Sequence, residues 1–170
     1  GLPRESVIPC AVPWPQAWSD LVQQIRGLSR PVMWEIFPGA CVLTRAFAEF
    51  GVSTAPPLDA GAVLEFNLLN MTFLAVVVGI VGSHGIDLIH LAPPCATFSI
   101  ALNGCAATRL RTAMEPEGIG ALNDKQRHQV ELGNALAEAA ATIVAAQHKA
   151  SNHFQLEQPE TSLMTQFKPV

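Results

Sequence analysis

The sequence has no tyrosine, and charged residues make up only 14% of its 170 residues, against about 25% in an average soluble domain. Ten basic residues stand against 14 acidic ones, which gives a net charge of −4. This balance argues against an autonomous, strongly basic nucleic-acid binder, although it allows a local basic patch. The apolar content of 49% excludes a disordered chain. The length predicts one domain with a real core.

Long hydrophobic runs and paired cysteines are missing too. The longest apolar stretch, Leu68–Gly82, has 15 residues, whereas a membrane span needs about 20, so it predicts a buried element and no membrane partner. No C-x-x-C pair occurs, so we expect no zinc site. The opening residues show neither an initiator Met nor a signal-peptide pattern, and we expect a piece of a longer protein. The four cysteines favour a reduced, intracellular setting, with the nucleus as one option, over a disulfide framework; they are Cys10, Cys41, Cys95 and Cys105.

The pattern along the chain predicts a peripheral arm followed by an α/β core. Residues 1–31 are rich in proline, and we expect them to pack onto the core, with a short helix over Trp18–Arg26. Residues 32–170 form the core, and segment 70–82 is assigned to a helix because of its length, although Val76–Val78 favours a strand locally. Alternating strands and helices predict a parallel sheet with helices on both faces. The expected strands are 32–37, 52–59, 86–91 and 153–159, and the expected helices are 41–51, 70–82 and 124–150.

A loop from Ala96 to Asn123 precedes the last helix, which Asn123 or Asp124 can cap. Basic residues in and after this loop either close on phosphate or form a solvated surface, and we favour the surface; they are Arg109, Arg111, Lys125 and Arg127. The five histidines do not cluster at metal-ligand spacing, so each is expected to be structural or at the surface; they are His84, His90, His128, His148 and His153.

Ligands of parallel α/β sheets bind beyond the carboxyl ends of the strands. That rule selects four places: Phe37–Ala40, Leu58–Asp59, Pro93–Ser99 and Glu157–Pro159. At Phe37–Ala40, a glycine turn after a strand allows a cofactor to approach the backbone closely, but any strand-to-helix connection can contain a glycine turn. In the second, Asp59 follows Gly39 by 20 residues. It either accepts hydrogen bonds from the ribose hydroxyls of a nucleoside or serves as a turn residue before Gly61.

The remaining two places carry candidate reacting groups. Two prolines hold Cys95 at the mouth of a strand, where a cysteine can act as a nucleophile. A free cysteine is more often buried and inert, and the residue taken alone favours that role. Glu157 is a candidate acid if it lies in an apolar mouth, and otherwise an ordinary loop glutamate.

Taken in order, the segments EIFPGACVLTRAFAEFG, LD, LAPPCATFSIA and FQLEQP resemble the DNA (cytosine-5)-methyltransferases over about residues 32–164. In that family a strand ending in F-x-G begins the S-adenosylmethionine site. A Pro-Pro-Cys-x-x-Phe-Ser segment carries the nucleophile, and a Glu-Asn dipeptide carries the acid. The resemblance implies an α/β, Rossmann-like S-adenosylmethionine-dependent methyltransferase sheet with three αβα layers, incomplete in this chain.

The resemblance also implies roles for particular residues on the cofactor side. Phe37 would pack on S-adenosylmethionine, while Gly39, with Ala40 beside it, would let the backbone approach it. Asp59 would bind the ribose. Asn67 aligns loosely with a family aspartate that contacts the adenine.

On the substrate side, the resemblance makes Cys95 the nucleophile that attacks carbon 6 of a flipped-out cytosine. Glu157 would hydrogen-bond ring nitrogen 3 and the exocyclic amine, while Pro94 and Ser99 would shape the pocket. The expected function is therefore methyl transfer to carbon 5 of cytosine in DNA. The alternative is an inactive or relic binding module within a larger or mobile-element-derived protein.

Several positions depart from the family pattern. Ala40, Cys41 and Val42 follow Gly39 where the family has more glycines, and Gln158 replaces the expected asparagine. No room remains after residue 170 for a target recognition domain, so we expect weak DNA binding by these residues alone. The oligomeric state is left open.

A zinc-dependent cytosine deaminase is a weaker alternative, because its His-x-Glu and Pro-Cys-x-x-Cys signatures are missing.

Overall fold

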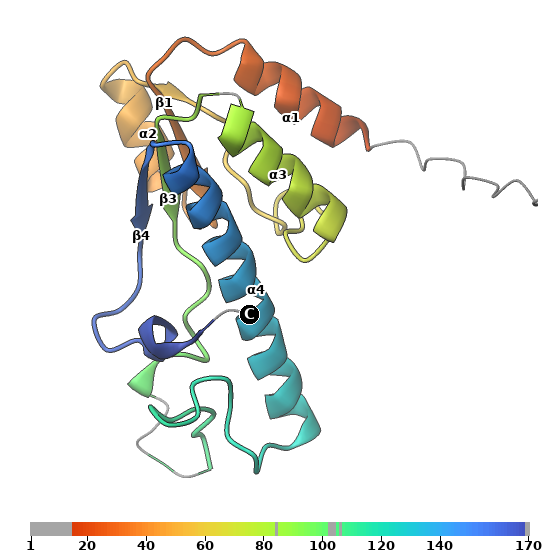
Figure 1. Cartoon of the computed structure of the whole chain (residues 1–170), viewed down its shortest axis with the longest axis vertical. Coiled ribbons are helices and arrows are strands. Elements are labelled where there is room, and N and C mark those ends of the chain that lie inside the picture. The colour runs from red at the N-terminus through yellow and green to blue at the C-terminus, as the bar shows by residue number, and fades with distance from the viewer. Residues whose placement is uncertain (1–14, 84, 102–104, 106, 169–170) are drawn as a thin grey trace, which may run out of the picture.

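The computed structural model describes residues 15–83, 85–101, 105 and 107–168. Residues 1–14 of the proline-rich stretch, which include Cys10, and His84 lie outside these residues. Helices and strands follow one another in the predicted order (Figure 1). They are α1 (Gln16–Arg26), β1 (Val32–Ile36), α2 (Val42–Glu49), β2 (Ser53–Thr54), α3 (Met71–Ser83), β3 (Leu88–Leu91), α4 (Asp124–Lys149), β4 (His153–Leu156) and the 3-10 helix η2 (Leu163–Gln166).

The four strands form an all-parallel sheet in the order β2-β1-β3-β4. This confirms the predicted α/β class with a parallel sheet. The segment 52–59 is expected as a short strand weakened in the middle by its two prolines, and the structure agrees: it pairs with β1 at Ser53 and Thr54 and touches β1 again at an isolated bridge between Ile36 and Leu58. Pro56 and Pro57 lie between these two places, and proline has no N–H to donate to a ladder.

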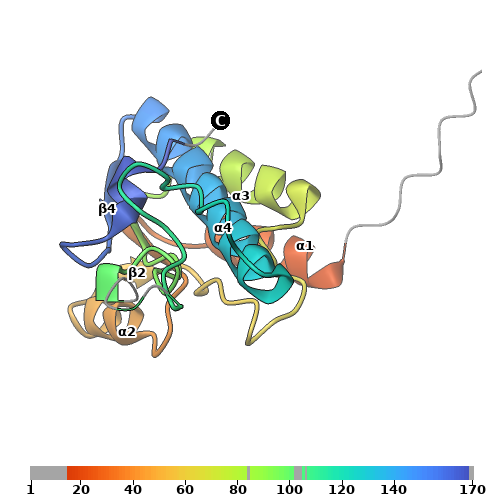
Figure 2. The same cartoon turned by 90° about the horizontal axis from the view of Figure 1, so that it is seen from below.

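Helices cover both faces of the sheet. Figures 1 and 2 show α2 on one face and α1, α3 and α4 on the other. Alternation along the strands assigns side chains to these two layers. Trp34 and Ile36 are fully buried in the larger core cluster, together with residues of α3 and α4, while Glu35 lies between them and points to the α2 side.

The core centres on α3, whose apolar residues extend all round the helix. Phe73, Val77 and Ile80 are buried there, so the prediction of a helix over 70–82 is confirmed. Trp18 of α1 packs on Phe73 with ring centroids 5.2 Å apart. Its indole N–H donates to the carbonyl of Glu65 at 2.8 Å, so α1 belongs to the core. Within the described residues, no helix combines the length and apolarity that a membrane crossing requires.

The long helix α4 begins at a capping box. The Asn123 side chain accepts a hydrogen bond from the Gln126 N–H, and the Gln126 side chain accepts one from the Asn123 N–H. Of the two predicted caps, Asn123 is the one used. Val130, Ala140 and Ile143 are buried along the predicted face.

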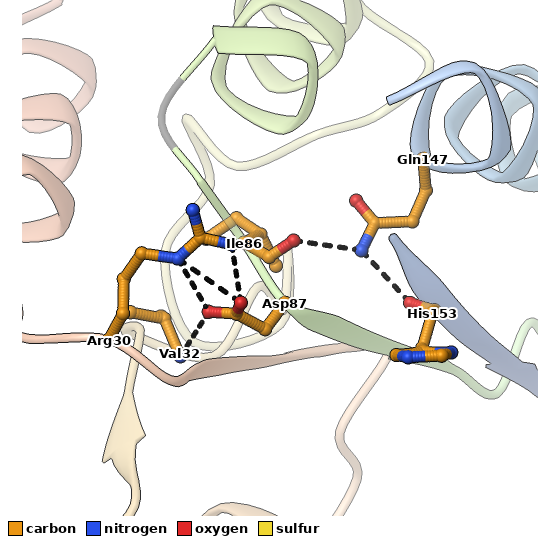
Figure 3. A network of polar contacts seen from close by, with 6 residues as sticks. All are labelled: Arg30, Val32, Ile86, Asp87, Gln147 and His153. Carbon is orange, nitrogen blue, oxygen red and sulfur yellow. Dashed lines mark hydrogen bonds and ion pairs between the residues drawn. The ribbon is translucent and has the colours of Figure 1, made fainter. Parts of the chain in front are cut away.

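Polar contacts join the starts of three strands at the amino edge of the sheet (Figure 3). The Asp87 carboxylate pairs with Arg30 and accepts a hydrogen bond from the Val32 N–H at 2.8 Å. The fully buried Gln147 of α4 donates to the carbonyls of Ile86 and His153. The chain therefore enters β1, β3 and β4 at fixed positions, which sets the register at the opposite edge.

The Asp87 contact predicts a loss of stability in acid. The hydrogen bond from Arg30 holds the pKa of Asp87 below its ordinary value, so its contribution is complete above about pH 4 and is lost as pH falls through the lower, folded-state pKa. Asp87→Ala leaves the Val32 N–H without its acceptor and is expected to lower the free energy of unfolding by about 1–2 kcal/mol at pH 7. Urea titrations at pH 7 and pH 2.5 measure this. An equal difference from wild type at both pH values would contradict it.

Candidate functional site

A crevice of about 480 Å³ opens at the carboxyl edge of the sheet, where β1 and β3 lie side by side. The chain leaves β1 toward β2 on one side and later places β3 on the other, so the loops after β1 and β3 diverge. Ligands of open α/β sheets bind at such a switch point. The volume lies within the usual range of small-molecule sites, about 300–1,000 Å³. The turn after β1 and the start of α2 form one wall, and residues of β3 and β4 form the other.

The turn between β1 and α2 has an unusual backbone. Phe37, Gly39 and Cys41 all have positive φ, at 60°, 52° and 53°. Such values are common for glycine but rare for other residues, and they persist where the surroundings enforce them. The Phe37 N–H donates to the Leu58 carbonyl at 3.0 Å, and the Cys41 N–H donates to the Pro38 carbonyl at 2.9 Å. A Cβ at Gly39 would meet no atom within 4 Å, so the space above it is open.

The buried carboxylate of Glu35 fixes the start of α2. Its Oε2 accepts hydrogen bonds from the backbone N–H of Thr44, at 2.8 Å, and from the Thr44 hydroxyl. The N-cap residue Cys41 supplies no side-chain cap. Glu35, from the neighbouring strand, therefore supplies the negative charge that a helix N-terminus favours.

Three polar side chains form the floor of the crevice. Glu35, His90 and Gln155 lie in register on β1, β3 and β4, so their side chains share one face of the sheet. All three line the crevice. Strands of a parallel sheet are usually apolar on both faces, so a polar row across three strands marks this edge as unusual.

His90 is a residue of this floor that the sequence did not single out as functional. It is 3% exposed, and its Nε2 lies 3.4 Å from Oε2 of Glu157. Its Nδ1 is buried without a partner among the described residues. The available signal was a histidine between two apolar residues, Ile89 and Leu91, in the expected strand segment IDLIHL. Only the register shows that it stands beside Glu35.

The structure ties the Pro-Pro-Cys segment to the segment that carries Glu157. The Gln158 side chain donates to the Pro93 carbonyl at 3.0 Å and accepts from the Ser162 hydroxyl at 3.0 Å. The Leu163 N–H donates to the Phe98 carbonyl at 2.9 Å. These contacts hold the two loops together across 65 residues of sequence.

Cys95 begins a tight turn and is half-buried. Its carbonyl accepts hydrogen bonds from the N–H groups of Phe98 and Ser99, at 2.9 and 3.0 Å. Ser99 pairs with Ser162 in an antiparallel bridge. Pro94 precedes the turn and lines a second hollow, of about 490 Å³, between the turn and the first half of α4.

The acid role would be favoured if Glu157 lay in an apolar mouth, but the structure does not enclose it. Its side chain is 69% exposed, as an ordinary loop glutamate would be. It lies at the end of the exposed edge strand β4 and lines the crevice on the α2 side. By contrast, Pro94 and Ala96, on either side of Cys95, line the hollow next to α4.

The three other predicted cofactor-side residues are not among those that line the crevice. Asp59 is half-buried beside the Leu58–Phe37 contact, and it makes the turn expected of it, accepting from the Gly61 N–H at 2.8 Å. Ala40 is exposed, and its carbonyl accepts from Arg45. Asn67 is exposed in the loop before α3, where its side chain accepts from the Leu69 N–H, outside the residues that line the crevice.

The surface position expected for Arg111 is wrong. Arg111 is 1% exposed, and its guanidinium lies 3.7 Å from the ring centroid of Phe98. Burial lowers its pKa to about 10, against the opposing effect of Glu117, so the side chain stays charged at neutral pH. The charge is accommodated because five acceptors surround it: the carbonyl and hydroxyl of Thr97, the carbonyls of Pro116 and Val130, and the amide oxygen of Asn134.

Arg111 thus joins the turn after Cys95 to α4. Close packing supports the same junction, because a Cβ at Gly133 would lie 2.5 Å from the Thr97 hydroxyl.

In the part of the chain that the structure describes, no three His, Cys, Asp or Glu residues converge as a metal site would require. Comparison of the chain with family models, curated proteins and solved structures finds no significant match.

We predict that Arg111→Met lowers the free energy of unfolding by about 3–5 kcal/mol, because several buried acceptors lose their donor at once. Arg111→Lys keeps the charge but not the fork of donors, and is expected to recover only part of this loss. The control is Arg127→Met at an exposed position, with a cost of about 0.5 kcal/mol. Urea denaturation measures all three. A cost for Arg111→Met no larger than that of the control would contradict the assignment.

Proposed function

We propose that this chain is a methyltransferase-like domain that binds S-adenosylmethionine in the crevice. We further propose that it transfers the methyl group to carbon 5 of cytosine in DNA through a covalent Cys95 adduct. The observation that carries the proposal is the crevice at the β1–β3 switch point, bordered by the left-handed turn of residues 37–41. The resemblance to DNA (cytosine-5)-methyltransferases places the cofactor at this turn.

The turn explains one departure from the family sequence pattern. Cys41 stands where the family has further glycines, yet its φ of 53° is a value that glycine adopts without strain. Cys41 thus holds a conformation that glycine adopts more readily, at a position where the resembled family has glycine.

The residues around the crevice suit a nucleoside cofactor. The half-buried Phe37 offers a ring to pack on, and the space above Gly39 lets a ligand reach the backbone. Asp59 follows Leu58, which bonds to Phe37, and its carboxylate can accept hydrogen bonds from ribose hydroxyls. When bound, S-adenosylmethionine supplies an activated methyl group.

Cys95 and Glu157 would carry the reaction at the base. The Cys95 thiolate would add to carbon 6 of the flipped-out cytosine, and the electron pair of the 5,6 double bond would pass to carbon 5. Carbon 5 would then take the methyl group as the sulfur–methyl bond of S-adenosylmethionine breaks and the neutral thioether leaves. Glu157 would donate a carboxyl proton to ring nitrogen 3 and accept a hydrogen bond from the exocyclic amine, which would stabilise the charge on the ring. Loss of the carbon 5 proton to a base then breaks the sulfur–carbon bond and frees Cys95. Gln158 supports this arrangement by holding the Pro93 carbonyl, as an amide side chain at this position can.

A second candidate is a module that binds the cofactor without transferring its methyl group. One observation favours it: Glu157 lines the crevice on the α2 side, whereas Pro94 and Ala96 line the hollow beside α4. DNA is the proposed macromolecular partner in the first candidate. With a net charge of −4, binding by these residues alone is expected to be weak.

Binding of S-adenosylmethionine, measured by titration calorimetry, tests the site common to both candidates. We expect saturable binding, and a loss of about tenfold in affinity for Gly39→Ala, because alanine is strained at a φ of 52°. Gly79→Ala is the matched control: an added Cβ is equally unobstructed there, but φ is not positive. A wild-type chain without saturable binding would refute both candidates.

Covalent trapping on DNA containing 5-fluorocytosine separates the two candidates. Release of Cys95 needs the loss of a proton from carbon 5, and fluorine at that carbon blocks this step. The enzyme candidate therefore predicts a stable adduct in the presence of S-adenosylmethionine. The adduct should disappear in Cys95→Ser and persist in Cys105→Ser, a change at an exposed cysteine. An adduct that survives Cys95→Ser would refute the assigned nucleophile. Cofactor binding without an adduct in wild type would select the binding module.

A further inference from the structure

His90 is a buried imidazole with a single polar neighbour among the described residues. Its Nε2 lies 3.4 Å from the Glu157 carboxylate, and its Nδ1 has no hydrogen-bond partner. A buried polar atom without a partner is unfavourable, and an aliphatic residue would fill the same space without it. Packing alone therefore does not account for a histidine at this position.

The other polar groups of the crevice floor do not satisfy His90. Glu35, beside it on β1, already accepts two hydrogen bonds from Thr44 through Oε2. Gln155, beside it on β4, is exposed. Among the described residues that line the crevice, the titratable groups are Glu35, His90 and Glu157. The contact of His90 is thus directed at Glu157.

The backbone of Glu157 is already fixed on both sides. Its N–H donates to the Leu91 carbonyl at 2.8 Å, and the next residue, Gln158, is bonded to Pro93. The side chain, 69% exposed, has three rotatable bonds and would otherwise sample many rotamers. A contact with the buried His90 ring favours those rotamers that keep the carboxylate near Nε2.

We propose that His90 is a positioning residue for Glu157: it donates a hydrogen bond from Nε2 and holds the carboxylate over the crevice, ready to accept from the amine edge of a base. This inference rests on the proposed function, because it takes Glu157 as the group that binds the base. It requires a proton on Nε2. The Nε2–Oε2 distance of 3.4 Å is long for a hydrogen bond, and catalytic hydrogen bonds that are long in a ligand-free site often shorten when the substrate binds.

Two substitutions at His90 separate a positioning role from a packing role. His90→Leu fills the buried space but removes the donor. His90→Gln restores an N–H near the position of Nε2. A packing role predicts that leucine is the better replacement, whereas positioning predicts that glutamine is.

The first readout is the order of the Glu157 side chain in the ligand-free protein, from NMR couplings and relaxation of its methylene groups. We expect one dominant rotamer in wild type and in His90→Gln, and averaging in His90→Leu. The second readout is the rate of Cys95 adduct formation on DNA containing 5-fluorocytosine. We expect it to fall by about 10–100-fold in His90→Leu and to recover in His90→Gln.

Equal order of Glu157 in all three proteins, or an unchanged adduct rate in His90→Leu, would overturn the inference. If His90→Leu does not fold, Glu157→Gln at the exposed position tests the same contact, because the ¹⁵N and ¹H signals of His90 Nε2 should shift. Unshifted signals would overturn it. If wild type forms no adduct, the proposed enzyme fails, while the order of Glu157 still decides the role of His90.

Discussion

The position of β1 between β2 and β3 is the constraint on which the rest of the structure depends. Connections between parallel strands are right-handed, so a chain that moves first to one side of β1 and then to the other must place its helices on opposite faces. α2 therefore covers one face, and α3 and α4 cover the other (Figure 2). The loops after β1 and β3 separate for the same reason, and the crevice is the space between them.

Polar groups inside this apolar fold are concentrated around the crevice and the turn after Cys95. Glu35 accepts two hydrogen bonds from Thr44 at the start of α2, and Arg111 is surrounded by five oxygen acceptors. A buried polar group without a partner costs about 1–3 kcal/mol, so such residues are retained only where they are satisfied or useful. Arg111 serves the structure, because it joins the turn to α4. Among the described residues, two buried side chains keep a polar atom without a hydrogen-bond partner, Gln147 at Oε1 and His90 at Nδ1. The amide N–H groups of Gln147 bridge two strands, whereas His90 has no such structural role.

Local patterns predicted the elements well, and the failures came from contacts between distant segments. Length favoured a helix over 70–82, and α3 confirms it, because a long run of apolar residues is stable as a buried helix. Arg111 was expected at the surface, since no local pattern shows that five acceptors will surround it. His90 stands out only through its register with Glu35, which depends on strand pairing. Of the predicted site residues, Phe37, Gly39 and Glu157 line the crevice. The others do not line it: Ala40, Asp59, Asn67, Pro94, Cys95 and Ser99.

The central claim is that the crevice at the β1–β3 switch binds a nucleoside cofactor. The most direct test is an NMR titration of the ¹⁵N-labelled chain with S-adenosylmethionine, which reports the position of the ligand without requiring any reaction. The account predicts saturable shifts of backbone signals at residues 37–43 and 90–92, with little change along the first half of α4. Shifts concentrated at Thr97, Gly133 and their neighbours, or no saturable shifts, would contradict it.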